Sequence, residues 1–157
     1  IENYLSFRSF THPPVYTCEE VRKLNLNIPG FELKNLFLRD RKGTRHFLLA
    51  VPVDKKVDLK ALALSLNLSG LGFASAERLK SCLGMEAGAV SVLGVFFDKE
   101  HRVEVLIDQD AWHADSYQCH PLINTATWVV GMADLERFFD IIDHKPRLLA
   151  VPARQDQ

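Results

Sequence analysis

The sequence contains few cysteines, and their spacing is not that of a metal site or a disulfide framework. Only three occur in 157 residues, Cys18, Cys82 and Cys119. They are odd in number and widely separated, and no CxxC pair is present, which argues against a zinc ribbon and against structural disulfides. We therefore expect a protein that uses no metal and no other cofactor, in a reduced, cytoplasmic setting.

Long apolar runs are also missing. No stretch approaches the roughly 18 apolar residues of a membrane-spanning helix, and the N-terminal residues lack the regions of a secretory signal. We expect no membrane partner. The composition is 47% hydrophobic and 25% charged with a net charge of −1, which is ordinary for a globular protein. Without repeats or a linker, residues 1–157 are expected to form one domain.

Several short runs have the alternation and the residue types of β-strands. The residues from Asp40 to Gly43 have turn chemistry, which predicts a hairpin between the strands on either side. A second hairpin is expected around the polar turn that runs from Asp98 to His101. The expected strands are residues 5–10, 34–39, 44–51, 96–97, 102–107, 125–130 and 148–151.

Four segments carry helix signals. Thr17 and Glu20 form a capping-box pattern, Asp58 and Ser75 are good N-caps, and Gly84 is a typical C-terminal stop. Apolar residues at helical spacing near the C-terminus predict an amphipathic helix. The expected helices are residues 17–24, 59–66, 76–83 and 135–144. Strand hairpins mixed with short helices predict an α+β fold built on one mixed sheet.

Lys34 and Asn35 are the first candidates for chemistry. Alternation places them on opposite faces of the expected strand. A lysine at the end of an apolar strand can extend its ammonium to the rim while its methylenes cover the core. It can also direct the cation into a cleft, where it would hold a phosphate or developing negative charge. An asparagine inside a strand is disfavoured unless its amide is used, either by nearby backbone groups or by a substrate.

His120 opens a second candidate segment. It precedes Pro121, which removes a backbone donor and stiffens the loop, and Asn124 is placed to brace the loop before the next strand. An isolated histidine is often structural. A metal site is disfavoured because Cys119 and His120, as adjacent residues, are poorly placed to share one ion. No Ser–His–acid pattern is recognisable, so a covalent enzyme intermediate is not expected.

Four cations gather within seven positions of the first expected hairpin. They are Arg39, Arg41, Lys42 and Arg45. Such a cluster could contact the phosphates of a nucleic acid, or it could be a solvated turn with no partner.

The stretches KNLFL at residues 34–38 and HPLIN at residues 120–124, in this order, resemble the YbaK/ProX family of aminoacyl-tRNA editing domains. The order of segments matches from Thr11 to the last expected helix, so the resemblance covers nearly the whole chain. It is strongest to the free-standing branch that deacylates alanine mischarged onto proline tRNA. The resemblance implies a curved mixed sheet surrounded by short helices, after an N-terminal helix that is shortened here.

The resemblance also implies roles for individual residues. The site residues it implies are Lys34, Asn35 and His120 for catalysis, Ser91, Gly94, Pro121 and Asn124 for the substrate, and Arg39, Arg41, Lys42 and Arg45 for tRNA. Lys34 would contact the terminal adenosine and its phosphate. Hydrolysis would use a positioned water and preorganised hydrogen-bond donors. The implied partner is the acceptor end of proline tRNA, and prolyl-tRNA synthetase is a second candidate partner.

Three departures from the family pattern leave the amino-acid preference open. Val92 stands where relatives commonly have proline, Trp128 where they have a small residue, and Tyr117 where other branches have glycine. Alanine on proline tRNA is the leading substrate, and serine, threonine or cysteine on tRNA is the alternative. A non-catalytic RNA-binding or regulatory module of the same fold is a third reading, against which the intact Lys34 and His120 argue.

Overall fold

The computed structural model describes residues 1, 4–14, 19 and 27–155. Eight strands form one sheet in the order β1-β7-β6-β2-β3-β5-β8, and β4 also pairs with β2. The strands are β1 (Phe7–Thr11), β2 (Phe31–Asp40), β3 (His46–Pro52), β4 (Leu71–Phe73), β5 (Val103–Asp108), β6 (Ser116–Cys119), β7 (Ala126–Gly131) and β8 (Arg147–Leu149). Three of the pairings are parallel, namely β2–β6, β3–β5 and β5–β8, and the others are antiparallel. The mixed sheet confirms the predicted α+β class.

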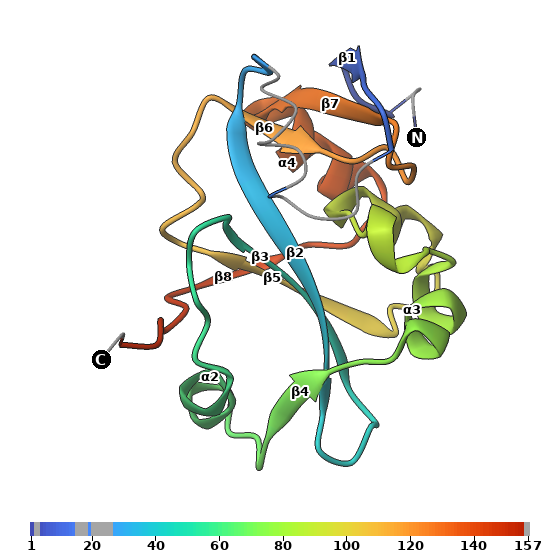
Figure 1. Cartoon of the computed structure of the whole chain (residues 1–157). Coiled ribbons are helices and arrows are strands. Elements are labelled where there is room, and N and C mark those ends of the chain that lie inside the picture. Colours follow the sequence, from blue (N-terminus) through green and yellow to red (C-terminus); the bar gives the residue numbers. More distant parts are fainter. Residues whose placement is uncertain (2–3, 15–18, 20–26, 156–157) are drawn as a thin grey trace.

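Short helices cover both faces of the sheet. They are α2 (Leu59–Ser65), α3 (Ala76–Leu83), α4 (Met132–Ile141) and the 3₁₀ helices η2 (Ala87–Ala89) and η3 (Val92–Phe97). Strand β2 runs the length of the molecule, from β6 and β7 at one end to β4 at the other (Figure 1). Its alternation divides the core: Phe37 packs in the cluster that contains α3, α4 and η3, whereas Leu38 packs with Leu62 of α2.

The first predicted hairpin is confirmed and is longer than expected. Strands β2 and β3 pair antiparallel from Leu33 opposite Pro52 to Arg39 opposite His46. The Asp40 carboxylate closes the turn by accepting hydrogen bonds from the backbone N–H groups of Thr44 (2.8 Å) and Arg45 (3.0 Å). These bonds, the one to Arg45 above all, lower the pKa of Asp40 despite its burial.

The predicted helix signals are confirmed where the structure describes them. Asp58 Oδ1 accepts from the Ala61 N–H at 3.0 Å to begin α2, and Ser75 Oγ accepts from the Arg78 N–H at 3.2 Å to begin α3. Gly84 ends α3 with a left-handed φ of +67°. The last helix ends at Ile141, before the predicted His144. The expected helix at residues 17–24 falls outside the described residues except for residue 19.

The second predicted hairpin is wrong. Residues 92–97 form the 3₁₀ helix η3 rather than a strand. The edges of β5 are occupied by β3 and β8, so no place in the sheet is left for a strand at residues 96–97. The Asp98 carboxylate instead accepts from the N–H groups of Arg102 and Val103, both at 2.9 Å, and lies 3.0 Å from His144 Nε2. Sequence reasoning also missed the short strands β4 and β6.

Candidate functional site

One edge of β2 is only partly covered by the described strands. At its start, β6 pairs with Phe31 and Glu32. At its end, β4 pairs with the residues from Leu38 to Asp40, and the Ala74 N–H donates to the Phe37 carbonyl at 3.0 Å. Between these two strands, no described strand pairs with residues 33–36 on this edge. Lys34 and Asn35 lie in that interval.

Asn35 carries a buried amide oxygen that lacks a partner. Its Oδ1 has no hydrogen bond within the described part of the chain. An unsatisfied buried acceptor costs on the order of 1–3 kcal/mol, so a native protein seldom keeps one without a use. Asn35 shares its face of β2 with the buried Phe37, so the amide belongs to the side of the sheet that carries the larger core cluster.

His120 has the same property and reaches the same part of the sheet from elsewhere in the sequence. It directly follows β6, which runs parallel to β2 with Tyr117 opposite Phe31 and Gln118 opposite Glu32. Continued by two positions, this register brings the backbone of His120 level with that of Lys34. His120 Nδ1 is buried and has no hydrogen-bond partner among the described residues. The fold therefore brings two unpartnered polar atoms to one edge of β2.

The environment of His120 keeps its ring neutral. Burial lowers its pKa below the ordinary value of 6.5, a hydrogen bond with the Ala126 backbone opposes this, and the charge of nearby His12 lowers it further. Because Nδ1 has no partner, the bond to Ala126 uses the other ring nitrogen. The neutral ring then leaves Nδ1 as a lone-pair acceptor.

His12 is a neighbour that sequence reasoning did not select. Its Nδ1 lies 2.9 Å from the Pro13 carbonyl and so must carry a proton, while Nε2 lies 3.0 Å from the Thr127 hydroxyl oxygen. The His12 N–H donates to the Thr125 carbonyl at 2.9 Å. These bonds fasten the end of β1 to β7 beside His120. In the sequence, His12 was distinguished only by its position near the start of the segments that resemble the family pattern.

Lys34 lies on the opposite face of β2 from Asn35. With Leu36 it lines a pocket of about 420 Å³ to which the start of α2 and the C-terminal segment also contribute. Lys34 and Leu36 therefore share one face of β2, as the predicted alternation requires. The Lys34 cation and the Asn35 amide thus lie on opposite faces of the same interval of β2.

The predicted substrate residues of the 92–97 region are packed inside the protein. Ser91 is fully buried, and its Oγ accepts from the Leu93 N–H at 3.2 Å as the cap of η3. A Cβ on Gly94 would lie 2.4 Å from Met85 Sδ. In the loop after β6, Pro121 and Asn124 are half-buried. A contact between any of these four residues and a substrate stays a prediction.

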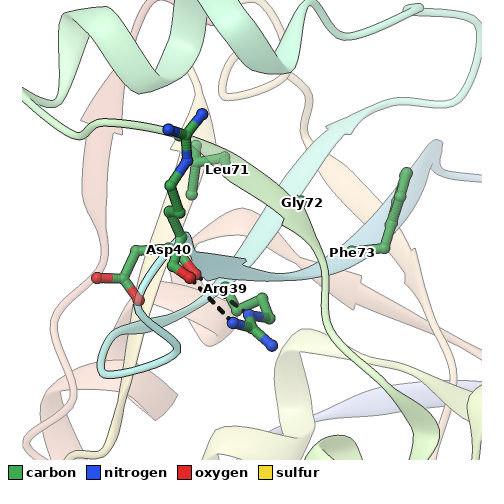
Figure 2. A pocket seen from close by; sticks show the side chains of 7 residues that line it. Arg39, Asp40, Leu71, Gly72 and Phe73 are labelled. Carbon is green, nitrogen blue, oxygen red and sulfur yellow. Dashed lines mark hydrogen bonds between the residues drawn. The ribbon is translucent and has the colours of Figure 1, made fainter.

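The four cations of the predicted basic turn have different surroundings in the structure. Arg39 and Arg41 line a second pocket, of about 340 Å³, along β4 (Figure 2). The Arg39 side chain donates to the carbonyls of Asp40 (3.2 Å) and Arg41 (3.1 Å). Arg45 instead forms a two-point ion pair with Glu104, at 2.9 and 2.7 Å. Lys42 is exposed at the turn. Binding of tRNA by these four residues stays a prediction.

Other kinds of site find little support in the described ranges. These residues contain no group of three or more His, Cys, Asp or Glu side chains that could hold a metal ion. The departures from the family pattern at Tyr117 and Trp128 are core residues: the Tyr117 hydroxyl donates to the Ala111 carbonyl at 2.8 Å, and Trp128 stacks on Phe7. Complete burial raises the pKa of the Cys119 thiol to about 12, so it is not a nucleophile at neutral pH.

Comparison with known proteins gives this site a context. The family model of the aminoacyl-tRNA editing domain matches residues 12–138. The chain belongs to this family. Members hydrolyse the ester bond of an aminoacyl-tRNA, and the chain is an enzyme of that class. The matched segment begins at His12 and includes β2, β4, β6 and β7, so it contains both unpartnered acceptors.

Individual relatives match the chain over most of its length. The chain is 39% identical to the prolyl-tRNA editing protein ProX of Acetoanaerobium sticklandii, over 85% of this chain and 81% of the relative. It is 35% identical to prolyl-tRNA synthetase associated domain-containing protein 1 of Danio rerio, over 88% and 76%. A human relative, named as putative for the same protein, is 30% identical over 88% and 83%.

Solved structures agree with the fold. One is described as a candidate trans-editing enzyme for prolyl tRNA synthetase. It matches with a TM-score of 0.70 at 15% identity, over 94% of this chain and 87% of that one. A hypothetical protein matches with a TM-score of 0.72 at 14% identity, over 93% and 91%. No helix within the described residues is long and apolar enough to cross a membrane.

Proposed function

We propose that the chain is a trans-editing deacylase that removes alanine from mischarged proline tRNA. The observation that carries the proposal is the pair of buried, unpartnered acceptors, Asn35 Oδ1 and His120 Nδ1, at the partly covered edge of β2. Family membership and the relative named as a prolyl-tRNA editing protein support it. This function would place the protein in the cytoplasm, where charged tRNA is used.

In this proposal the two acceptors hold a water molecule between them. The water would donate one hydrogen to the Asn35 amide oxygen and the other to His120 Nδ1, which leaves an oxygen lone pair free to attack. Attack on the ester carbon forms the new C–O bond and breaks the bond to the ribose oxygen, which takes up a proton from the water, so that free alanine and uncharged tRNA are released. A neutral His120 suits this role, because an imidazolium would donate rather than accept. Such catalysis depends on positioning more than on ionised groups.

Lys34 would act from the other side of β2. An ammonium in a pocket is suited to a phosphate of the terminal nucleotide, and binding there would place the ester at the edge where Asn35 lies. The partner implied is the acceptor end of proline tRNA. The names of the relatives support an association with prolyl-tRNA synthetase as part of the same proposal.

Hydrolysis as a second selection step explains why a separate domain is useful. A synthetase site that binds proline cannot strongly reject a smaller amino acid, so a site that accepts only small residues removes the error afterwards. In this proposal the loop from His120 to Asn124 walls the pocket, so that alanine enters and proline is excluded by its size.

The test is a deacylation panel with proline tRNA charged separately with alanine, serine, cysteine, threonine and proline. We expect hydrolysis of the alanyl ester and little hydrolysis of the prolyl ester. Asn35→Ala should slow hydrolysis about 100-fold, whereas Asn27→Ala, at an exposed asparagine, should not. Preference for the seryl or cysteinyl ester would show that serine or cysteine, rather than alanine, is the amino acid removed. Inactivity on all five esters would refute the proposed function.

A further inference from the structure

His12 holds β7 from one edge, at the point where that strand begins. The His12 N–H donates to the Thr125 carbonyl at 2.9 Å, and His12 Nε2 lies 3.0 Å from the Thr127 hydroxyl oxygen. His12 and Thr127 are both buried, at 8% and 3% exposure, so water does not compete for this contact. His12 thus fixes the residues on either side of Ala126, the first residue of β7.

The backbone of Ala126 is turned toward the opposite edge of β7. Thr11 and Ala126 face each other across β1 and β7. Because the His12 N–H bonds the Thr125 carbonyl, Thr11 and Ala126 form a pair whose own backbone groups do not bond each other. The N–H and carbonyl of Ala126 therefore point away from β1, toward the edge that β6 occupies in the sheet (Figure 1).

His120 approaches Ala126 from that edge. Strand β6 pairs antiparallel with β7, with Cys119 opposite Trp128, and this register continued by one position brings the backbone of His120 level with that of Thr127. Burial lowers the pKa of the His120 ring, and a hydrogen bond between the ring and the Ala126 backbone acts to raise it. A bond that favours the charged ring is one that the ring donates, so its acceptor is the Ala126 carbonyl.

Two histidines therefore hold the same three residues from opposite edges of β7. His12 bonds the first and the third of residues 125–127, and His120 bonds the one between them. The charge of His12 also acts on His120 and lowers its pKa, as expected of two rings that lie close together. A shift of residues 125–127 would carry the Ala126 carbonyl with it and turn the His120 ring.

We propose that His12 is a positioning residue, which fixes the orientation of the His120 ring through the Ala126 carbonyl. With the ring donating from Nε2, the lone pair of Nδ1 is held in one direction. The imidazole of His12 is needed for the contact with Thr127, whereas its bond to Thr125 uses only the backbone. In the proposed function the Nδ1 lone pair holds the attacking water, and in that respect the inference rests on the proposed function.

The test replaces each ring nitrogen of His12 by an amide group in turn. The side-chain amide of glutamine reaches about as far as Nε2 of histidine, and that of asparagine about as far as Nδ1. His12→Gln therefore keeps a group beside Thr127, whereas His12→Asn keeps only the group that faces the Pro13 carbonyl. Thr127→Val removes the hydroxyl with little change of shape. Thr11→Val, at an exposed threonine of β1, is the matched control.

The orientation of the His120 ring is measured by NMR, without any need for catalysis. In protein with isotope-labelled histidine, a ring held in one tautomer has well-separated nitrogen resonances, and a ring that exchanges between tautomers has resonances that converge. His120→Ala identifies the His120 signals by their loss. We expect separated resonances in the wild type, His12→Gln and Thr11→Val, and convergence in His12→Asn and Thr127→Val.

Kinetics tests the consequence for deacylation. His12→Asn and Thr127→Val should lower kcat on alanyl-tRNA about 10- to 100-fold, the scale of a misplaced group, and leave KM nearly unchanged because His12 does not contact the substrate. His12→Gln should recover most of the rate. Since His12 acts through His120, adding His12→Asn to His120→Ala should cause little further loss. Thermal melting of each variant is followed on the same samples.

The outcomes separate this inference from the proposed function. Unchanged His120 resonances in His12→Asn and Thr127→Val, equal effects of His12→Gln and His12→Asn, or a loss that adds to that of His120→Ala would overturn the inference, even if the protein hydrolyses alanyl-tRNA. Resonances that converge in His12→Asn and Thr127→Val but not in His12→Gln, in a protein that hydrolyses no aminoacyl-tRNA, would support the inference and refute the proposed function.

Discussion

Lys55 and Asp108 form a buried ion pair, with Lys55 Nζ 2.5 Å from Asp108 Oδ2. The Asp108 side chain is fully buried and that of Lys55 is 12% exposed. Lys55 Nζ also donates to the Val151 carbonyl at 2.9 Å. The lysine therefore joins β5 to the C-terminal segment. This segment contributes Arg154 to the pocket that contains Lys34.

Lys55→Met should destabilise the protein strongly, because it leaves the Asp108 carboxylate buried without its cation. Loss of one partner of a buried pair costs about 3–5 kcal/mol, and we expect that decrease in the free energy of unfolding from urea titration. Lys80→Met removes an exposed pair and should leave the unfolding curve unchanged. A Lys55 variant as stable as the wild type would show that the pair contributes nothing to the fold.

The same pair sets an upper limit to the stable pH range. Burial alone would lower the pKa of Lys55, but the hydrogen bonds to Asp108 and Asp110 outweigh it and raise the pKa above 10.5. A raised lysine pKa contributes stability that is fully present below the unfolded value and is lost as pH rises through the folded one. The wild type should thus lose stability in strong alkali by a step that Lys55→Met lacks. Parallel curves for the two proteins above pH 10 would contradict this.

Gly94→Ala should destabilise the protein by about 1–3 kcal/mol, the usual cost of overpacking a core. The new Cβ would lie 2.4 Å from Met85 Sδ, and Met85 is buried, so the side chain has little room to move. Met85→Ala should recover part of the loss in the double variant, as coupling between contacting residues requires. Gly72→Ala is the control, since its Cβ would meet nothing within 4 Å. Additive effects of the two substitutions would exclude the contact.

Local signals predicted much of this fold, and non-local pairing explains what they missed. The turn at Asp40 and the caps at Asp58 and Ser75 act within a few residues, so the sequence predicted them. The arrival of Asn35 and His120 at the same edge of β2 depends on the parallel register of β6 on β2, which no local pattern encodes. The failed hairpin at residues 96–107 has the same origin, because β5 takes both of its partners from distant strands.

The candidate site was predicted in part for the same reason. Lys34, Asn35 and His120 stood out through family resemblance, and the buried, unpartnered atoms of Asn35 and His120 now give two of them a physical basis. The exposure of Phe73, which lines the pocket that contains Lys34, could not be predicted, because an isolated phenylalanine in a short apolar run is expected in the core. The ion pair between Arg45 and Glu104 could not be predicted either, since it joins β5 to the start of β3.

Deacylation should depend on the neutral form of His120. Its pKa lies below 6.5 because burial disfavours the charged ring. Activity is therefore expected to fall toward acid pH with a midpoint below 6.5, as the ring becomes protonated and Nδ1 ceases to accept. The rate constant at saturating aminoacyl-tRNA, measured as a function of pH, is the test. An acid limb with its midpoint above 6.5 would contradict the assigned environment of His120.

Lys34→Ala should abolish most deacylation and leave the fold intact, because the side chain lines a pocket and is only half-buried. We expect a loss of about 100-fold or more in kcat/KM, the scale of an electrostatic contact to the reacting end. Lys60→Ala, in the same pocket, should mainly raise KM. Hydrolysis and thermal melting would be followed on the same samples. Full activity, or a loss of stability in step with activity, would show that Lys34 is not a residue of the site.

Selectivity gives the sharpest test of the pocket wall. If His120 and the loop after it exclude proline by size, His120→Ala should slow hydrolysis of alanyl-tRNA and also admit the larger prolyl ester, because the enlarged pocket no longer rejects it. The measurement is the ratio of hydrolysis rates for the alanyl and prolyl esters in both proteins. His113→Ala, at an exposed histidine before β6, is the matched control and should keep the wild-type ratio. A His120 variant that loses rate with an unchanged ratio would assign His120 to water positioning alone and place the size filter on other residues.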